Sequence, residues 1–260
     1  MAAGWVIAVS ELSLYFLFSN KIRKYYRELQ TMNVVIYYWL TMTVLTMIWE
    51  CSFVYQYKSI NAFSQELIET KTHVWTNDYQ WYYVLPWKTA YIFYGEYGAY
   101  ADREYMVSAN DWSRVIESSH AMFCGVGAML VLYQKIINDF YTTKDMKYSI
   151  KYSNTNLDKY YLAMGVSMGS QLMNSVLYMA NYFVQIQDQY NINYCSREFP
   201  CRFALLSRAF MYVNVFWTVL PLYAIVYTWN NCNKIWMRFS LETENSRSPK
   251  QEWRPIDQDE

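Results

Sequence analysis

Five long apolar stretches divide the chain, and each is long enough to cross a bilayer as a helix. The apolar core of a bilayer is about 30 Å thick, which roughly 20 helical residues span. The stretches cover residues 3–19, 33–56, 114–134, 157–184 and 204–229. The first is the shortest, and it contains one charged residue, Glu11. The pattern predicts an all-α fold, a five-span transmembrane helix bundle with a long lumenal segment between spans two and three.

A soluble all-helical protein is the alternative, because Tyr-rich amphipathic helices also occur in globular cores. Residues 121–133 and 160–187 contain no charged side chain, and the second run is longer than most soluble helices. This favours the membrane. No repeat or flexible linker interrupts residues 1–239, so they are expected to form a single five-span membrane domain. Residues 240–260 are polar and predict a flexible cytosolic tail.

Basic residues predict the orientation in the membrane. They lie directly after the first stretch, between the third and fourth, and after the fifth. Since Lys and Arg concentrate on the cytoplasmic side, we expect a lumenal N-terminus and a cytosolic C-terminus. The first stretch lacks a basic start and a clear cleavage site, which favours a retained span over a signal peptide. Cys195 and Cys201 then lie in a lumenal loop, where both a disulfide and two free thiols are open.

Composition excludes several classes of function. Lys and Arg together number 22, as do Asp and Glu, so the chain has no basic field to attract nucleic acid. The five Cys and two His residues show no metal-ligand spacing, so we expect neither a metal nor a cofactor. The 28 Tyr and 11 Trp residues suit membrane interfaces and aromatic cavities. The expected partners are the membrane and a lipid, and a homodimer stays open.

Ionisable side chains inside the apolar stretches are candidates for chemistry. Glu50 lies in the second stretch, and Glu117 opens the third with His120 on the same helical face. Asn214 and Trp217 share a face in the fifth. Burying a carboxyl costs several kcal/mol unless it is paired, hydrated or protonated, so such residues usually face a cavity. There, one group can donate a proton and another remove one, while Trp217 stabilises the cation between, as in alkene isomerisation.

A purely structural interpretation carries similar weight on these residues alone. Glu50 would then form an intramembrane ion pair with Arg114 or Arg208, and Trp217 would only pack. The two interpretations differ in whether the carboxyls meet around a shared cavity.

Several motifs in the second half of the chain carry a family resemblance. Gln171-Leu172 is followed by Val176-Leu177-Tyr178, and residues 210–221 include an Asn-x-x-Trp and a Leu-Pro pair. Upstream, Glu96-Tyr97 is followed by Asp102-Arg103-Glu104-Tyr105. These segments resemble the emopamil-binding (EXPERA) family, multi-span endoplasmic-reticulum proteins that include the sterol Δ8-Δ7 isomerase. The resemblance covers residues 33–229.

The resemblance implies a site and a mechanism. Glu50 and Glu117 match the family's second-span and third-span glutamates, Asp102 its acidic loop position, and Asn214 with Trp217 the pair that borders the sterol. In the isomerases such groups protonate a ring double bond and remove a neighbouring proton without a cofactor. The predicted catalytic residues are Glu50, Glu117 and His120. The predicted substrate-binding residues are Thr46, Trp49, Glu96, Asp102, Ser175, Tyr178, Asn214 and Trp217.

Three departures from the family pattern change the expected pocket. Thr46 stands where the isomerases carry a His, and Ser175 stands where an Asp is usual. The segment from Glu96 to Asp102 is one residue longer than in the family. His120, in turn, stands where the family tends to carry Thr, so Thr and His have exchanged helices. If both face one cavity, the imidazole is retained on a different wall.

Three functions are therefore open. The first is an isomerase that moves a double bond in a sterol or another polycyclic terpenoid. The second is a non-catalytic sterol-binding or lipid-binding member of the family, which Thr46 and Ser175 favour. The third is a membrane-bound cyclase or rearranging enzyme of terpenoid specialised metabolism, since the same acids can open an epoxide or protonate a polyene.

Overall fold

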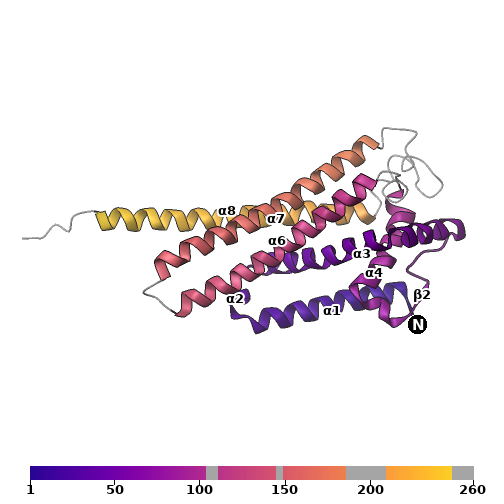
Figure 1. Ribbon diagram of the computed structural model, residues 1–260, viewed down its shortest axis with the longest axis horizontal. Coiled ribbons are helices and arrows are strands. Elements are labelled where there is room, and N and C mark those ends of the chain that lie inside the picture. The colour runs from indigo at the N-terminus through magenta and orange to yellow at the C-terminus, as the bar shows by residue number, and fades with distance from the viewer. Residues whose placement is uncertain (104–110, 145–148, 186–208, 248–260) are drawn as a thin grey trace, which may run out of the picture.

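The described part of the chain is helical almost throughout, which confirms the prediction of an all-α fold (Figure 1). The computed structural model describes residues 1–103, 111–144, 149–185 and 209–247, with side chains for 1–103, 114–137, 159–181 and 212–232. Five long helices run roughly along the long axis of the molecule. They are α1 (Gly4–Tyr25), α3 (Val34–Thr70), α6 (Asp111–Lys144), α7 (Ser149–Gln185) and α8 (Ala209–Arg247). Each predicted apolar stretch lies mainly in one of these helices.

Shorter elements gather at one end of the molecule, around the C-terminal end of α3 (Figure 1). There, β1 (Ala2–Ala3) pairs antiparallel with β2 (Asp78–Tyr79), and Ala2 lies opposite Tyr79. The 3₁₀ helix η1 (Trp81–Val84), α4 (Pro86–Glu96) and the π-helical turn η2 (Tyr97–Ala101) follow. Helix α2 (Arg27–Gln30) connects α1 with α3 at the opposite end. These short elements occupy much of the segment that the sequence predicts to be lumenal.

Local signals explain the bounds of α3. The side chain of Asn33 caps its first turn, where Oδ1 accepts hydrogen bonds from Val35 N at 2.9 Å and Ile36 N at 3.2 Å. The helix ends where Lys71 adopts a left-handed conformation with φ of 53°. It therefore extends to Thr70, well past the predicted end of the second span at residue 56. Its last turns lie among the short elements.

The long helices pack as neighbours. Helix α6 lies against both α3 and α7, and α7 lies against α8. Two glycines permit close approach of α6 to its neighbours. A Cβ at Gly125 would lie 2.5 Å from Met47 Cβ, and a Cβ at Gly127 would lie 2.8 Å from Ser167 Cβ. Both distances are too short for non-bonded carbon atoms. The backbone of α6 therefore contacts side chains of α3 and α7 directly at these two glycines.

A buried apolar core occupies the half of the bundle near α2. It is formed by large side chains of α2, α3 and the turn between them, and by small or flexible side chains of α6, α7 and α8. Its buried members are Leu29, Met32, Ile36, Tyr37, Trp39, Leu40, Ala128, Val131, Met164, Met168 and Ala224. We call this cluster the packed core.

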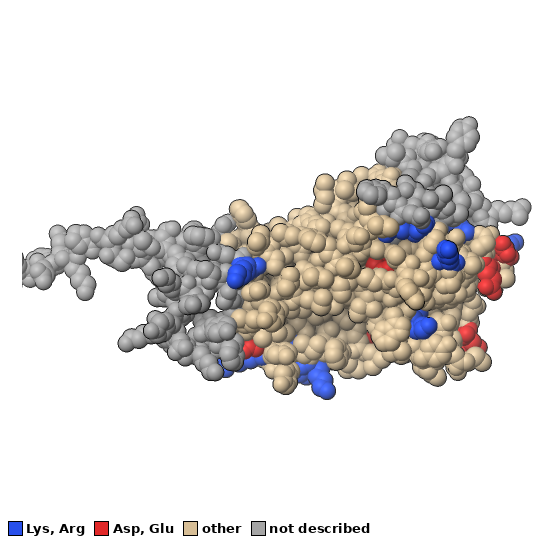
Figure 2. Space-filling view, in the orientation of Figure 1, with Lys and Arg blue, Asp and Glu red and all other residues tan. Residues whose placement is uncertain are grey.

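Apolar side chains also cover much of the outer surface. On the face drawn in Figure 2, Lys, Arg, Asp and Glu gather towards the two ends, and the broad middle is almost free of them. Exposed large apolar residues include Phe123 and Leu130 on α6 and Phe216 and Trp229 on α8. By length and composition, two helical segments of the described residues, Val34–Thr70 and Arg114–Ile137, are able to cross a membrane. These features are consistent with membrane association.

Three sequence predictions fall partly or wholly outside the described residues: the state of Cys195 and Cys201, the ion pair of Glu50 with Arg208, and the 240–260 tail. Cys195, Cys201 and Arg208 all lie outside the described residues. Helix α8 continues to Arg247, so the first residues of the predicted 240–260 tail are helical.

Candidate functional site

A cavity of about 480 Å³ lies between the long helices, next to α4 and η2. We call it the chamber. It is lined by side chains from most elements of the fold, including α1, and from the connection between α3 and β2. Its lining residues are Leu12, Thr43, Thr46, Trp49, Glu50, Trp75, Phe93, Tyr94, Tyr97, Glu117, His120, Ala121, Cys124, Gln171, Asn174, Ser175, Tyr178, Val213, Asn214 and Trp217. All of the predicted site residues except Glu96 and Asp102 are among them.

The two predicted catalytic carboxyls face the same chamber from different helices. Glu50 extends from α3, and its Oε2 is buried without a hydrogen-bond partner among the described residues. Glu117 extends from α6, and its Oε2 accepts a hydrogen bond from Asn174 Nδ2 at 2.9 Å. The guanidinium carbon of Arg114 lies 3.6 Å from the centre of the Tyr57 ring. The structure gives Glu50 no ion pair with Arg114, contrary to that part of the structural interpretation.

His120 lines the chamber one helical turn after Glu117. Its Nε2 lies 3.0 Å from the carbonyl oxygen of Ser170 and 3.3 Å from Cys124 Sγ. Because a carbonyl oxygen only accepts, Nε2 carries a hydrogen, and Nδ1 is the nitrogen that can gain or lose a proton. Thr46 lines the same chamber and donates to Met42 O at 3.0 Å. The exchanged Thr and His therefore lie on two walls of one cavity.

A chain of hydroxyl groups leads from the chamber to Asp102. Tyr178 donates to Asp102 Oδ2 at 2.7 Å, so the phenol oxygen of Tyr178 accepts a hydrogen bond from the Tyr97 hydroxyl. Burial raises the pKa of Tyr97 well above its ordinary value, and the neighbouring Asp102 raises it further. The Tyr97 phenol is therefore a donor rather than an anion. Asp102 is buried behind the tyrosines and contacts the chamber through them.

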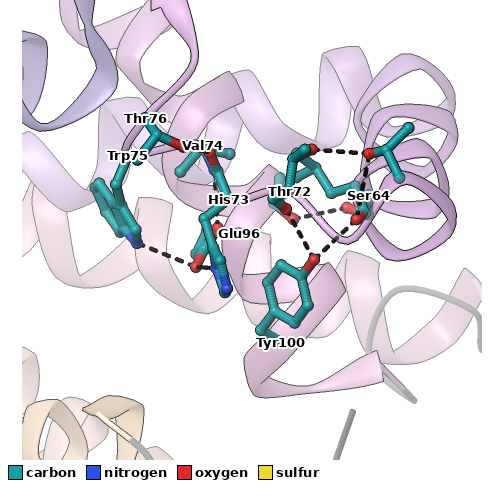
Figure 3. Close-up of polar contacts among 11 residues, drawn as sticks. Ser64, Thr72, His73, Val74, Trp75, Thr76, Glu96 and Tyr100 are labelled. Atoms are coloured by element: carbon teal, nitrogen blue, oxygen red, sulfur yellow. Dashed lines mark hydrogen bonds and ion pairs between the residues drawn. The ribbon is translucent and has the colours of Figure 1, made fainter. Parts of the chain in front are cut away.

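Glu96 lies outside the chamber lining and holds the connection between α3 and β2 (Figure 3). Its Oε1 accepts from Trp75 Nε1 at 3.0 Å and lies 2.7 Å from His73 Nδ1. Its Oε2 accepts from the backbone N of Val74 at 3.1 Å. Since the Trp75 indole lines the chamber, Glu96 affects the cavity through this indole rather than by direct contact.

The indole of Trp217 forms part of the wall next to the packed core. Its ring centre lies 4.7 Å from that of Trp39 in an edge-on arrangement, and Trp39 Nε1 donates to Gln171 Oε1 at 2.9 Å. Ser175 donates to the Trp217 carbonyl oxygen at 3.0 Å. Trp217 therefore both packs and lines the chamber. An aromatic face beside buried carboxyls can stabilise a cation.

Sequence reasoning missed several lining residues. Asn174 follows Gln171 by three positions and shares its helical face with Tyr178, so helical periodicity could have found it. Leu12, Trp75 and Phe93 carry no comparable signal, because they reach the chamber only through the packing of separate segments.

No protein-family model matches the chain, and no curated protein or solved structure matches it. The family resemblance therefore stays a prediction, and the proposed function rests on the chamber.

Proposed function

We propose that this protein is a five-span endoplasmic-reticulum membrane enzyme of the sterol-isomerase type. It would move a double bond in a sterol or another polycyclic terpenoid by protonation and deprotonation, without a cofactor. The observation that carries this proposal is that Glu50, Glu117 and the Trp217 indole line one largely apolar cavity. Burying a carboxyl in such surroundings costs free energy, and carboxyls kept there despite that cost are typical of functional sites.

The chamber has the size and chemistry of a lipid-binding site. Its volume of about 480 Å³ lies within the usual range of small-molecule sites, roughly 300–1,000 Å³. Aromatic and apolar side chains form most of the wall, and a few polar groups come from separate helices. A membrane location would let an apolar substrate reach it from the bilayer. The apolar outer surface and the charge distribution in Figure 2 support that location.

In the proposed reaction, one of the two carboxylic acids donates its proton to an alkene carbon, and the π electron pair forms the new C–H bond. The adjacent carbon becomes cationic and lies against the Trp217 indole. The other carboxylate then removes a proton from the next carbon, and that C–H electron pair forms the shifted double bond. After this step the second carboxyl carries a proton and the first has lost one. A proton then moves from the second carboxyl back to the first, so the cycle needs no oxidant or reductant. His120, through Nδ1, is placed to assist this return.

A non-catalytic lipid-binding protein is the second candidate. Thr46 donates its hydroxyl to the backbone of its own helix, and a hydroxyl does not replace the family's imidazole as a proton carrier near neutral pH. In that case the chamber would bind amine-bearing sterol mimics without converting any lipid.

The decisive experiment incubates the purified protein with Δ8 sterols and oxidised triterpenoids in deuterated buffer. An isomerase incorporates one deuterium into a product with a shifted double bond. Glu117→Gln should lower the rate about 10²–10⁴-fold, the usual contribution of an acid or base, and Glu66→Gln on the exposed surface of α3 should not. Saturable binding without product would identify the non-catalytic alternative. An undiminished rate in Glu117→Gln would refute the proposed mechanism.

A further inference from the structure

Helix α1 meets α3 through a row of polar groups. Glu11, Tyr15 and Ser19 are spaced four residues apart and so lie on one face of α1. Tyr15 donates its hydroxyl to Tyr38 O at 2.7 Å, and Ser19 O accepts from Tyr37 Oη at 2.6 Å. Nearest to the chamber, Glu11 Oε1 accepts from Trp49 Nε1 at 2.8 Å.

Glu11 is an unusual member of this row. It is only 2% exposed, and in the part of the chain that the structure describes its Oε2 has no hydrogen-bond partner. Burying a carboxyl with one unsatisfied oxygen is unfavourable. Stability alone therefore gives no reason for a carboxyl here. Glu11 is outside the chamber lining but hydrogen-bonded to Trp49, which lines it, so Glu11 lies behind the wall.

The side chain that Glu11 holds is part of the chamber wall. Trp49 lines the cavity and directly precedes Glu50, a proposed catalytic residue. The ring centre of Phe93 lies 5.0 Å from that of Trp49, in an edge-on contact. The indole borders the open space of the chamber, so part of its surface lacks a packing partner. The hydrogen bond to Glu11 restrains the remaining rotation, which would otherwise move the indole into the cavity next to Glu50.

We propose that Glu11 is a positioning residue of the chamber, which fixes the Trp49 indole as a wall beside Glu50 and so sets the substrate's position. The proposal rests on the proposed function. A second indole is held in the same way: Trp75 donates to Glu96, which also lies outside the lining, and the Trp75 ring centre is 6.3 Å from that of Phe93. Two carboxyls outside the chamber thus hold an aromatic wall of three rings.

The experiment compares Glu11→Leu, Glu11→Gln, Trp49→Phe and the double variant Glu11→Leu/Trp49→Phe in the full chain. A misplaced wall should lower kcat/KM about 10- to 100-fold in Glu11→Leu. Glu11→Gln keeps an acceptor oxygen and should restore most of the activity. The double variant should be no worse than Trp49→Phe, because Glu11 acts through the indole.

Tyr15→Phe is the matched control. It removes a hydrogen bond of the same row on α1 but lies outside the chamber lining. If Glu11→Leu acted only by loosening α1, Tyr15→Phe would cause an equal loss of kcat/KM. Equal losses, or fully additive effects in the double variant, would overturn the proposal.

Incorporation of 5-fluorotryptophan gives a readout that is independent of turnover. The ¹⁹F resonance of Trp49 is identified by its loss in Trp49→Phe, and it should shift and broaden in Glu11→Leu but not in Tyr15→Phe. If the wild-type protein binds an amine-bearing sterol mimic without turnover, the proposed function fails. Glu11→Leu should then still weaken that binding about tenfold, and an unchanged resonance with unchanged affinity would reject the positioning role.

Discussion

The chamber and the packed core share the inward faces of the four long helices α3, α6, α7 and α8. On α6, Glu117, His120 and Cys124 line the chamber, and the stripe continues through Ala128 and Val131 in the core. The other helices repeat this arrangement. On α3 the stripe runs from Ile36 and Leu40 to Thr43, Thr46 and Glu50, on α7 from Met164 and Met168 to Gln171, Ser175 and Tyr178, and on α8 from Ala224 to Trp217 and Asn214.

The difference between the two ends lies in which side chains meet, not in which faces point inward. At the core end, the flexible side chains of Met164 and Met168 pack in one buried cluster with the small Ala128 and Ala224. At the chamber end, carboxyls and amides from separate helices face an open cavity of about 480 Å³. Trp39 and Trp217 form the border. The bundle therefore keeps tight packing in one half and reserves an open volume in the other.

The largest expected effect is at the packed core. Met168→Ala removes a fully buried side chain and should lower the free energy of unfolding by about 2–5 kcal/mol, because the helices cannot close the space. Met173 lies on the same helix but is 58% exposed. Met173→Ala should therefore change the free energy of unfolding by less than about 0.5 kcal/mol. Chemical unfolding in detergent measures both. Equal losses would mean that the core is not tightly packed.

A matched pair on α6 compares the two ends directly. Ala128→Phe overfills the core and should destabilise the protein by about 1–3 kcal/mol. Ala121 lies two turns away and faces the chamber, so Ala121→Phe should leave stability unchanged and abolish ligand binding by occupying the cavity. Thermal unfolding and ligand titration separate these outcomes. Strong destabilisation by Ala121→Phe would contradict an open chamber.

Two glycines test how closely the helices approach. A Cβ at Gly127 would lie 2.8 Å from Ser167 Cβ, so Gly127→Ala should cost about 1–2 kcal/mol, the overpacking penalty less the gain in helix propensity. Among the described residues, no atom beyond the neighbouring backbone of its own helix lies within 4 Å of a Cβ added at Gly165. Gly165→Ala should therefore stabilise the protein slightly. Denaturant midpoints measure the pair. Similar shifts of the same sign would show that α6 and α7 are not in contact at Ser167.

The smallest effect concerns the carboxyl in the chamber. Glu50→Gln replaces a buried, unsatisfied carboxyl oxygen with a neutral amide and should raise the free energy of unfolding by up to about 1 kcal/mol while it lowers turnover. Glu66→Gln, at an exposed position of α3, should change neither the free energy of unfolding nor turnover. Unfolding and activity are measured on the same preparations. Destabilisation by Glu50→Gln would show that this carboxyl supports the fold.

The amino-acid sequence by itself determined the all-helical fold and the composition of each inward stripe. Helical periodicity is local, so it correctly placed Glu117 with His120, and Asn214 with Trp217, on shared faces. The number of membrane spans and the catalytic roles stay predictions. The apolar pattern did not predict that α3 continues to Thr70, where the left-handed Lys71 ends it.

The tertiary structure also decided where the space is. Ala121 and Ala128 occupy the same face of one helix, yet one lines a cavity and the other is buried in the core. Likewise, Glu96 lies behind the wall, Leu12 and Trp75 form part of it, and Glu11 holds Trp49 from outside. The physical reason is that a cavity depends on which distant side chains enter the same volume, whereas a helical pattern records only neighbours three or four residues apart.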